Sequence, residues 1–206
     1  MAIRTYTIEG RGEPTRLLFL MHGWDANEFH LAAFGPLMDP DARYLVVAPR
    51  GPVEVSANGV GWYPFDDNDV LRQRLDELDA LLDSLCEQHG FQRAEAVVGG
   101  FSQGALLAVA LGIRKNARPP LAGVISLCGF LPPLSVVEAD WERAAKTRFL
   151  VQRGTADPYI DAERARELVR TLAEHDATVT AEEYPMSHDS TIESLAGVRD
   201  WLRSLA

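Results

Sequence analysis

Cysteines, basic residues and long apolar runs are all scarce in this chain of 206 residues. The only cysteines are Cys86 and Cys128, and neither belongs to a CxxC or Cys/His pattern, so neither a disulfide framework nor a zinc site is indicated. No apolar run approaches the roughly 18 residues that a membrane-spanning helix needs. The N-terminal segment is polar and of mixed charge, unlike a secretory signal. We therefore expect a cytoplasmic protein that does not insert into membranes.

Acidic residues outnumber basic ones by 30 to 20, which gives a formal net charge of −10. Because no Lys/Arg cluster interrupts this excess, we expect neither nucleic acid nor anionic membrane surfaces as partners. The composition, 47% hydrophobic and 24% charged, is usual for a globular protein with one sizeable core. No repeat, low-complexity tract or linker divides the chain. We expect one domain over residues 1–206, and a homodimer is left open.

Short apolar runs alternate with longer amphipathic ones along the chain. The predicted strands are Arg16–Met21, Tyr44–Ala48, Ala94–Val98, Ala122–Leu127, Arg148–Gln152 and Thr178–Tyr184. The predicted helices are Asp69–His89, Asp161–His175 and Ile192–Leu205. Several of the strands are apolar at successive positions, which is typical of strands buried on both faces of a parallel sheet. The alternation predicts an α/β fold, with a mostly parallel central sheet and helices on both faces.

One serine stands where a predicted strand meets a helix-like segment, in the stretch G-G-F-S-Q-G-A. At a sharp strand–turn–helix corner, the hydroxyl of Ser102 would project above the sheet, and Gly100 and Gly104 would let strand and helix approach closely. The N–H of Gln103 would open the helix and point at an oxyanion forming on an attacked carbonyl. The motif favours a nucleophile, and the alternative is a glycine-rich turn with an N-capping serine.

A serine nucleophile needs a base, and the base needs a carboxylate that orients it. The chain order serine, acid, histidine is typical of α/β-hydrolases, and only His175 and His188 follow a plausible acid. His188 alone follows a predicted strand at the sheet edge that also carries Ser102. Asp157 follows the strand Arg148–Gln152 at the same edge, although an Asp before Pro is also a common turn former. The other candidate acids are Asp140, Asp161 and Asp189.

The loop after Arg16–Met21 is expected to supply a second N–H group for the oxyanion. In the stretch F-L-M-H-G-W-D-A, Gly23 lets the chain turn closely and the N–H of Trp24 can reach the site. The alternative is that this His-Gly pair is merely a turn.

Together, these segments resemble the carboxylesterase/phospholipase family of α/β-hydrolases, which includes acyl-protein thioesterases and small bacterial esterases. The motifs concerned are L-M-H-G-W-D-A-N-E, A-P-R-G-P, G-W-Y-P-F, G-G-F-S-Q-G-A, C-G-F-L-P, R-G-T-A-D-P-Y-I and M-S-H-D. The resemblance runs from about Arg16 to the C-terminus, and it implies the nucleophile Ser102, the acid Asp157 and the base His188. It further implies the oxyanion donors Trp24 and Gln103, an α/β-hydrolase fold without a cap domain, and no metal or organic cofactor.

The resemblance also implies that Gly61–Phe65 and Gly129–Leu131 line an acyl groove. The large side chains expected around it are those of Trp62, Phe130, Leu131 and Met186. Because the site is uncapped, we expect a shallow apolar groove that suits short to medium acyl chains.

The chain departs from its apparent relatives at two positions. Asp25 stands where they carry the second glycine of H-G-x-G; Asp is among the few non-glycine residues that tolerate a positive φ there. A carboxylate near the oxyanion would be unfavourable, so we expect Asp25 to face solvent or the following helix. Cys128 stands where relatives carry the serine of S-G-x-L-P. It either lies near the pocket or acts as a small buried hydrophobe.

These residues predict a serine carboxylesterase of the EC 3.1.1 type, which cleaves small ester or thioester substrates through an acyl-enzyme. Acyl-thioesterase and lysophospholipase activity at the same site are alternatives. An acyltransferase would share the acyl-enzyme but exclude water. A non-catalytic binding protein on this fold is the remaining alternative, because fold alone does not determine function.

Overall fold

The computed structural model of the protein describes residues 3–8 and 12–205, so parts of the N-terminal segment and the last residue lie outside it. Within these residues, seven strands form one sheet in the order β1-β3-β2-β6-β7-β8-β9. They are β1 (Thr5–Ile8), β2 (Arg16–Met21), β3 (Tyr44–Pro49), β6 (Val97–Phe101), β7 (Gly123–Leu127), β8 (Arg148–Gly154) and β9 (Thr178–Tyr184). Only the edge pairing of β1 with β3 is antiparallel. The mostly parallel sheet that the apolar runs predicted is therefore confirmed.

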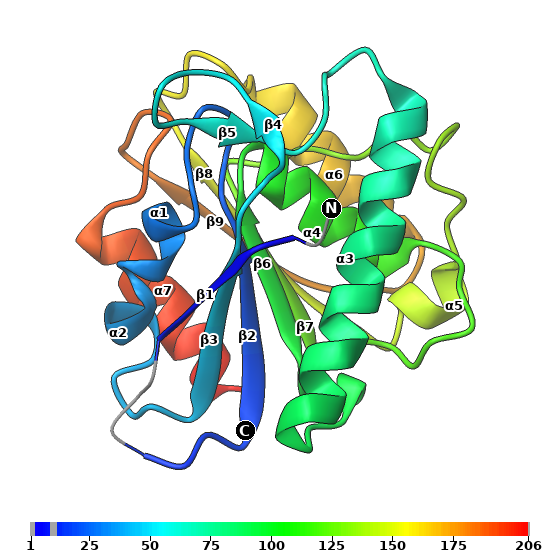
Figure 1. The fold of residues 1–206 in the computed structure, drawn as a ribbon. Helices are drawn as coiled ribbons and strands as arrows, with labels where there is room; N and C mark the ends of the chain where they lie inside the picture. Colours follow the sequence, from blue (N-terminus) through cyan, green and yellow to red (C-terminus); the bar gives the residue numbers. More distant parts are fainter. Residues whose placement is uncertain (1–2, 9–11, 206) are drawn as a thin grey trace.

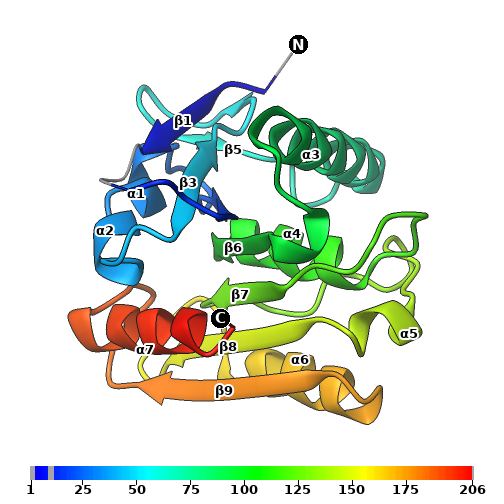
Figure 2. The ribbon, with the colours of Figure 1, turned by 90° about the horizontal axis from the view of Figure 1, so that it is seen from below.

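Helices cover both faces of this sheet (Figure 1). One face carries α3 (Asn68–His89), α4 (Gln103–Ile113), α5 (Trp141–Ala144) and α6 (Ala162–Glu174). The other carries α1 (Phe29–Ala32), α2 (Gly35–Met38) and α7 (Ile192–Arg203). Figure 2 shows the sheet between these two layers. Each layer has its own apolar cluster, because the central strands bury side chains on both faces.

One predicted strand is displaced along the chain. The sequence predicted a strand at Ala94–Val98, whereas Arg93–Glu95 forms a 3-10 turn and β6 begins at Val97. The turn is closed by the Glu95 carboxylate, which accepts the Gln92 N–H at 2.7 Å. The strand instead continues through the glycines to Phe101, where it pairs with β2 and β7.

Several short elements were not predicted. They are β1, α1, α2, α5 and a hairpin of β4 (Val53–Glu54) and β5 (Val60–Gly61). The helices among them have only four residues each, too few for an apolar period to show. The hairpin matters for the site, because Val60 donates to the Ala26 carbonyl at 2.7 Å and so holds the loop after β2.

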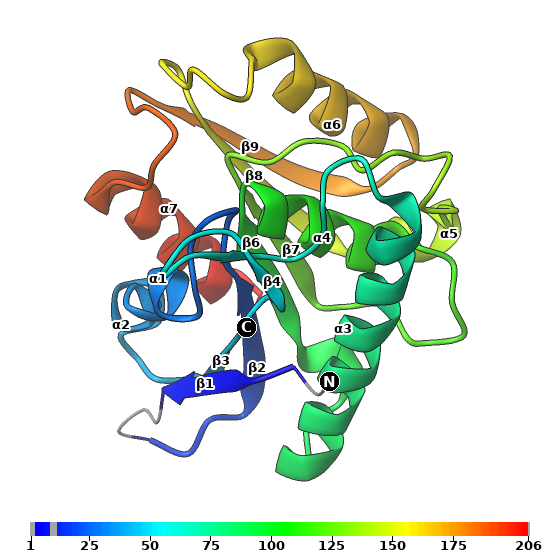
Figure 3. The same ribbon diagram turned by 45° about the horizontal axis from the view of Figure 1, so that its top comes forward.

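The carboxyl ends of the parallel strands meet at one edge of the sheet, which Figure 3 brings forward. The loop after β2, the junction of β6 with α4, and the loops after β8 and β9 all lie there (Figure 3). Side chains far apart in sequence can therefore share one site at this edge. Among the described helices, none is both long enough and apolar enough to cross a membrane.

Candidate active site

Ser102 occupies a strained corner between β6 and α4, with φ 53° and ψ −111°. Its N–H donates to the Leu127 carbonyl of the neighbouring strand at 2.9 Å. A Cβ at Gly100 would collide with the backbone of Gly104, and a Cβ at Gly104 would collide with the Met21 carbonyl. Both glycines are therefore required for the close approach of helix and strands, and the geometry is that of a strand–turn–helix corner.

Asp157 and His188 are joined by a hydrogen bond of 2.7 Å between Oδ2 and Nδ1. The other carboxylate oxygen, Oδ1, accepts the N–H groups of Tyr159 at 2.9 Å and Ile160 at 3.0 Å. Burial opposes the charge of Asp157, but these N–H groups and the His188 ring outweigh it and hold the pKa of Asp157 below its ordinary value. The carboxylate is thus ionised and fixed in position at neutral pH.

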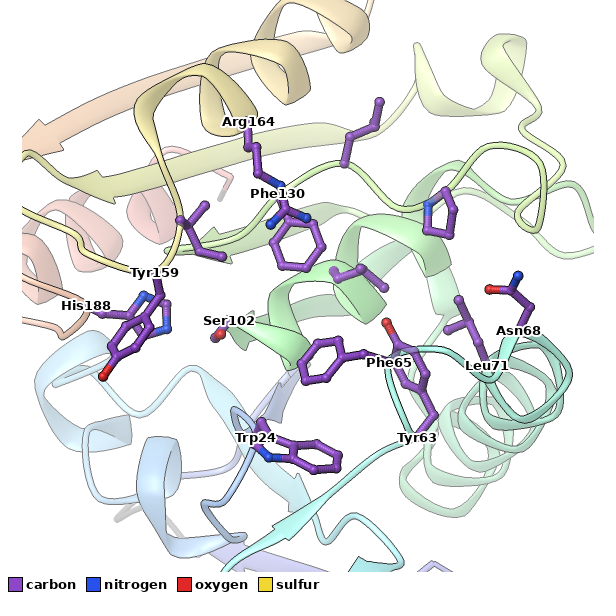
Figure 4. Close-up of a pocket in the computed structure, with 14 residues that line it drawn as sticks. Trp24, Tyr63, Phe65, Asn68, Leu71, Ser102, Phe130, Tyr159, Arg164 and His188 are labelled. Carbon is purple, nitrogen blue, oxygen red and sulfur yellow. The ribbon is translucent and has the colours of Figure 1, made fainter. Parts of the chain in front are cut away.

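The His188 ring and the Ser102 hydroxyl face the same pocket (Figure 4). The rings of Phe101 and Tyr159 pack on His188, with centroids 4.8 and 5.3 Å from its own. Within the described residues no hydrogen bond joins Ser102 to His188; such contacts often tighten only when substrate binds. The arrangement leaves Nε2, the nitrogen opposite the Asp157 bond, to act toward the pocket.

The competing acids and the competing histidine are engaged elsewhere. Asp140 and Asp161 cap α5 and α6, where their side chains accept backbone N–H groups at 3.0 Å. Asp189 is exposed and accepts the Ser190 N–H at 2.7 Å. His175 stacks on Trp141 at a centroid distance of 4.0 Å. The pairing of the acid and base candidates therefore falls on Asp157 and His188.

Two backbone N–H groups are the candidates for holding an oxyanion. That of Gln103 directly follows Ser102 and opens α4, and that of Trp24 follows Gly23, where an added Cβ would lie 3.5 Å from the Ser102 Cβ. Neither N–H has an acceptor within the described chain. The Gln103 side chain is occupied with structure, since Oε1 accepts the Trp62 N–H at 2.9 Å and Nε2 donates to the Tyr63 carbonyl at 2.8 Å. Trp24 and Gln103 thus stay the predicted oxyanion donors, on segments that meet at Ser102.

His22 supports the loop that carries Trp24, a role that sequence reasoning missed. Its Nε2 accepts the Gly51 N–H at 3.0 Å, which leaves the ring proton on Nδ1, 2.7 Å from the Gly23 carbonyl. Trp62 stacks on the ring and donates its indole N–H to the His22 carbonyl at 2.8 Å. Burial lowers the pKa of His22 to about 4, so the ring is neutral at pH 7. The position of His22 directly after β2, at the start of the loop that carries Trp24, was the feature of the sequence that could have indicated this role.

Acid should destabilise the protein through His22. Because its pKa lies below the ordinary 6.5, the stability that comes with the neutral ring is present above pH 6.5 and is lost as the pH falls toward 4. Between pH 7 and pH 4.5 we expect the free energy of unfolding to fall by about 2 kcal/mol more in the native protein than in His22→Gln. Urea unfolding at the two pH values measures this difference. Equal losses in the two proteins would contradict it.

Asp25 has φ 58°, as anticipated for a residue in a glycine position of the family motif. Its side chain is exposed and lies against Gly59 of the β4–β5 hairpin, where a Cβ would collide with Oδ1. Asp25 does not line the pocket that contains Ser102. The carboxylate therefore faces the hairpin and solvent, away from the two N–H groups.

Cys128 is fully buried beneath the acid–base pair, and it also has a positive φ, of 49°. Its Sγ lies 3.6 Å from the Asp189 carbonyl, and it lies within 4.8 Å of a carboxylate oxygen of Asp157 and a ring nitrogen of His188. These three atoms could in principle hold a metal ion. Burial and the neighbouring Asp157 raise the pKa of Cys128 to about 12, however, which disfavours the thiolate that a metal would need. Cys128 is thus both a buried small residue and a neighbour of the pair.

A pocket of about 810 Å³ opens beside Ser102 and has mainly apolar walls (Figure 4). It is lined by Trp24, Tyr63, Phe65, Asn68, Leu71, Ser102, Leu106, Phe130, Leu131, Pro133, Tyr159, Ile160, Arg164 and His188. Two of the four predicted groove residues, Phe130 and Leu131, are therefore in its wall. Sequence reasoning did not single out Tyr159, Ile160 or Arg164, although the first two closely follow Asp157.

Trp62 and Met186 lie outside this pocket. Trp62 is fully buried, because its ring turns inward to stack on His22, whereas Tyr63 and Phe65 of the same segment face the pocket. β5 ends at Gly61 and the chain bends at Trp62 and Tyr63, so no strand alternation in the sequence indicates which of these rings faces the pocket. Met186 is 6% exposed and packs in the apolar cluster with α7. We therefore no longer assign either side chain to the acyl groove.

Known proteins are similar to this chain over nearly its whole length. The Bacillus subtilis protein MhqD is 29% identical over 201 residues, covering 94% of this chain and 95% of that protein. Acyl-protein thioesterase 1 of Mycosarcoma maydis is 24% identical over 235 residues, covering 98% of this chain and 97% of that protein.

Solved structures of similar fold include two carboxylesterases. That of Bacillus cereus has a TM-score of 0.86 at 22% identity, covering 99% of this chain and 95% of the other. That of Mesorhizobium loti has a TM-score of 0.85 at 23% identity, covering 98% and 95%. These likenesses show the α/β-hydrolase fold. The profile of one family, described as phospholipase/carboxylesterase, matches residues 4–206. The chain therefore belongs to the phospholipase/carboxylesterase family.

Proposed function

We propose that the protein is a serine hydrolase that cleaves carboxylic esters of short to medium acyl chains. The observation that supports this most strongly is the arrangement at the pocket: a strained Ser102 shares it with His188, whose other ring nitrogen is held at 2.7 Å by Asp157. Family membership supports the same reaction class. A binding protein would have no need for a serine held in a costly backbone conformation opposite an oriented imidazole.

The proposed reaction runs through an acyl-enzyme. His188 takes the Ser102 proton as Oγ attacks the ester carbonyl, and the N–H groups of Trp24 and Gln103 stabilise the oxyanion. His188 then gives the proton to the departing alcohol oxygen. In the second half, His188 takes a proton from a water molecule as its oxygen attacks the acyl carbon; the bond to Ser102 Oγ then breaks, His188 returns the proton to Oγ, and the acid leaves. Asp157 stays ionised throughout and stabilises the imidazolium that forms in each step.

Acyl thioesters are the second candidate substrates. The name of the Mycosarcoma maydis relative, acyl-protein thioesterase 1, favours them. Attack on a thioester carbonyl uses the same nucleophile, base and oxyanion donors. The leaving thiolate depends less than an alkoxide on protonation by His188. Turnover of an acyl-thioester beside a p-nitrophenyl ester of the same acyl chain, with Ser102→Ala as control, distinguishes the two preferences.

The acyl-chain preference should peak at short to medium length. Trp24, Phe65 and Tyr159 are 37%, 56% and 74% exposed, so the pocket is open toward solvent. Each added methylene gains about 0.8 kcal/mol only while it still covers apolar wall. We expect kcat/KM for p-nitrophenyl esters to rise from acetate, to peak, and to flatten or fall by palmitate.

Phe130→Ala should move this peak toward longer chains, because the smaller side chain leaves room in the groove for further methylenes to reach the remaining apolar wall. Phe29→Ala is the matched control, since Phe29 is 54% exposed and does not line the pocket. A steady rise to palmitate in the native protein would count against a shallow groove and favour lipid-like substrates.

A further inference from the structure

Arg164 projects from the first turn of α6 into the wall of the pocket (Figure 4). Its guanidinium carbon lies 3.9 Å from the centroid of the Phe130 ring. Within residues 3–8 and 12–205, the guanidinium forms no ion pair, and only the backbone N–H of Arg164 forms a hydrogen bond, to the capping Asp161. The nearby Glu163 instead pairs with Arg170 at 3.3 Å. Five N–H donors at the pocket wall are thus without an acceptor.

The charge of the pocket contrasts with that of the whole protein. Acidic residues outnumber basic ones by 30 to 20, yet no Asp or Glu is among the residues that line this pocket. Arg164 places a permanent positive charge among mainly apolar side chains. Arg164 is exposed, so water screens part of this charge, but no carboxylate in the pocket lining neutralises it. The wall therefore favours a ligand with a negative group.

Tyr63 lines the same pocket and adds a neutral donor. Burial raises the pKa of Tyr63 to about 12, so its hydroxyl keeps its proton at neutral pH, while the charge of Arg164 acts on the pKa in the opposite direction. Within the described chain the Tyr63 hydroxyl has no hydrogen-bond partner, since only its backbone carbonyl is engaged. One fixed cation and one neutral donor suit a group with a single negative charge.

We propose that Arg164 binds a carboxylate at the far end of the acyl chain, so that the preferred substrates are monoesters of dicarboxylic acids. This inference rests on the proposed esterase function. The acyl chain crosses the apolar wall of Phe130 and Leu131 from Ser102 to Arg164. A carboxylate matches the guanidinium fork by two parallel hydrogen bonds. Hydrolysis consumes one water and yields an alcohol and a dicarboxylate.

The kinetic test pairs each acidic substrate with a neutral isostere. The substrates are 4-methylumbelliferyl monoesters of adipic and suberic acid, and the same esters with the free carboxylate replaced by a primary amide. We expect the ratio of kcat/KM for acid over amide to fall at least about tenfold in Arg164→Gln, the usual effect of losing a charged hydrogen bond. The acid-over-amide ratio of Arg164→Lys should lie between those of the native protein and Arg164→Gln. Added salt should lower the ratio of the native protein.

Arg166→Gln is the matched control. Arg166 lies on the same helix, is exposed and does not line this pocket, and its loss changes the net charge equally. Its acid-over-amide ratio should equal that of the native protein. A fall of the same size in Arg166→Gln would show a general field effect and overturn the inference.

A binding measurement separates this inference from the proposed function. Adipic acid mono-butylamide, which is not an ester, is titrated into the native protein and Arg164→Gln by calorimetry. We expect a Kd about tenfold higher in the variant. Hydrolysis with equal acid-over-amide ratios in the two proteins would overturn the inference and leave the esterase function standing. Arg164-dependent binding without any ester hydrolysis would support the inference and overturn the esterase function. If neither the binding nor the hydrolysis were observed, the inference and the esterase function would both be overturned.

Discussion

Replacement of Ser102 by alanine is expected to lower kcat for ester hydrolysis about a millionfold. Without Oγ no acyl-enzyme can form, and His188 has no proton to take. The pocket and the two N–H groups would remain, so a small rate above that of the uncatalysed reaction should persist. The measurement is steady-state turnover of a p-nitrophenyl ester at enzyme concentrations high enough to detect residual activity.

Ser187→Ala is the matched control for this variant. Ser187 is exposed and adjoins His188, but its side chain forms no hydrogen bond within the described chain. It should retain activity within about twofold, as surface changes usually do. Ser102→Ala must also keep the native melting temperature, which shows that the corner between β6 and α4 has survived. Retained hydrolysis in pure, folded Ser102→Ala would exclude this serine as the nucleophile.

Asp157→Asn is expected to lower kcat about ten-thousandfold. The N–H groups of Tyr159 and Ile160 both donate to Oδ1, so the asparagine would keep its carbonyl there and turn its NH₂ toward His188 Nδ1. Nδ1 must then accept, which places the ring proton on Nε2, the nitrogen that faces the pocket. The imidazole could no longer take the Ser102 proton.

Asp161→Asn and Asp189→Asn are the controls for the acid. Asp161 caps α6 and Asp189 accepts a neighbouring N–H, so asparagine should preserve most of either contact. We expect both variants to keep kcat within about threefold, measured with the same ester over a pH series. If either lost as much activity as Asp157→Asn was expected to lose, the acid would have to be reassigned.

Sequence predicted most reliably what depends on local pattern. The bounds of β2 are those that the sequence predicted, because a strand buried in a parallel sheet leaves an apolar run with polar ends. The bounds of the edge strand β9 also agree, although β9 is mainly polar and has no buried residue. Asp157 follows β8 and His188 follows β9, and parallel strands end at one edge, so their meeting could be anticipated without a structure.

Long-range contacts decided what sequence reasoning missed. Trp62 was expected in the groove, but its hydrogen bond to the His22 carbonyl turns the ring into the core. Arg164 lies on the exposed side of an amphipathic helix, where the sequence pattern indicates only a solvated charge. Only the packing of α6 over the sheet brings it onto Phe130, which is distant in the chain. Such placements depend on how elements dock, and a residue pattern within one element does not contain that information.

The most direct test of a serine nucleophile at the β6–α4 corner is covalent labelling with a fluorophosphonate, followed by mass spectrometry of the digested protein. The strained backbone of Ser102 and the pocket that it shares with the imidazole of His188 predict one adduct per chain, on the peptide that contains Ser102. Labelling should vanish in Ser102→Ala and slow greatly in Asp157→Asn. An adduct on another residue, or no adduct on folded protein, would contradict the assignment.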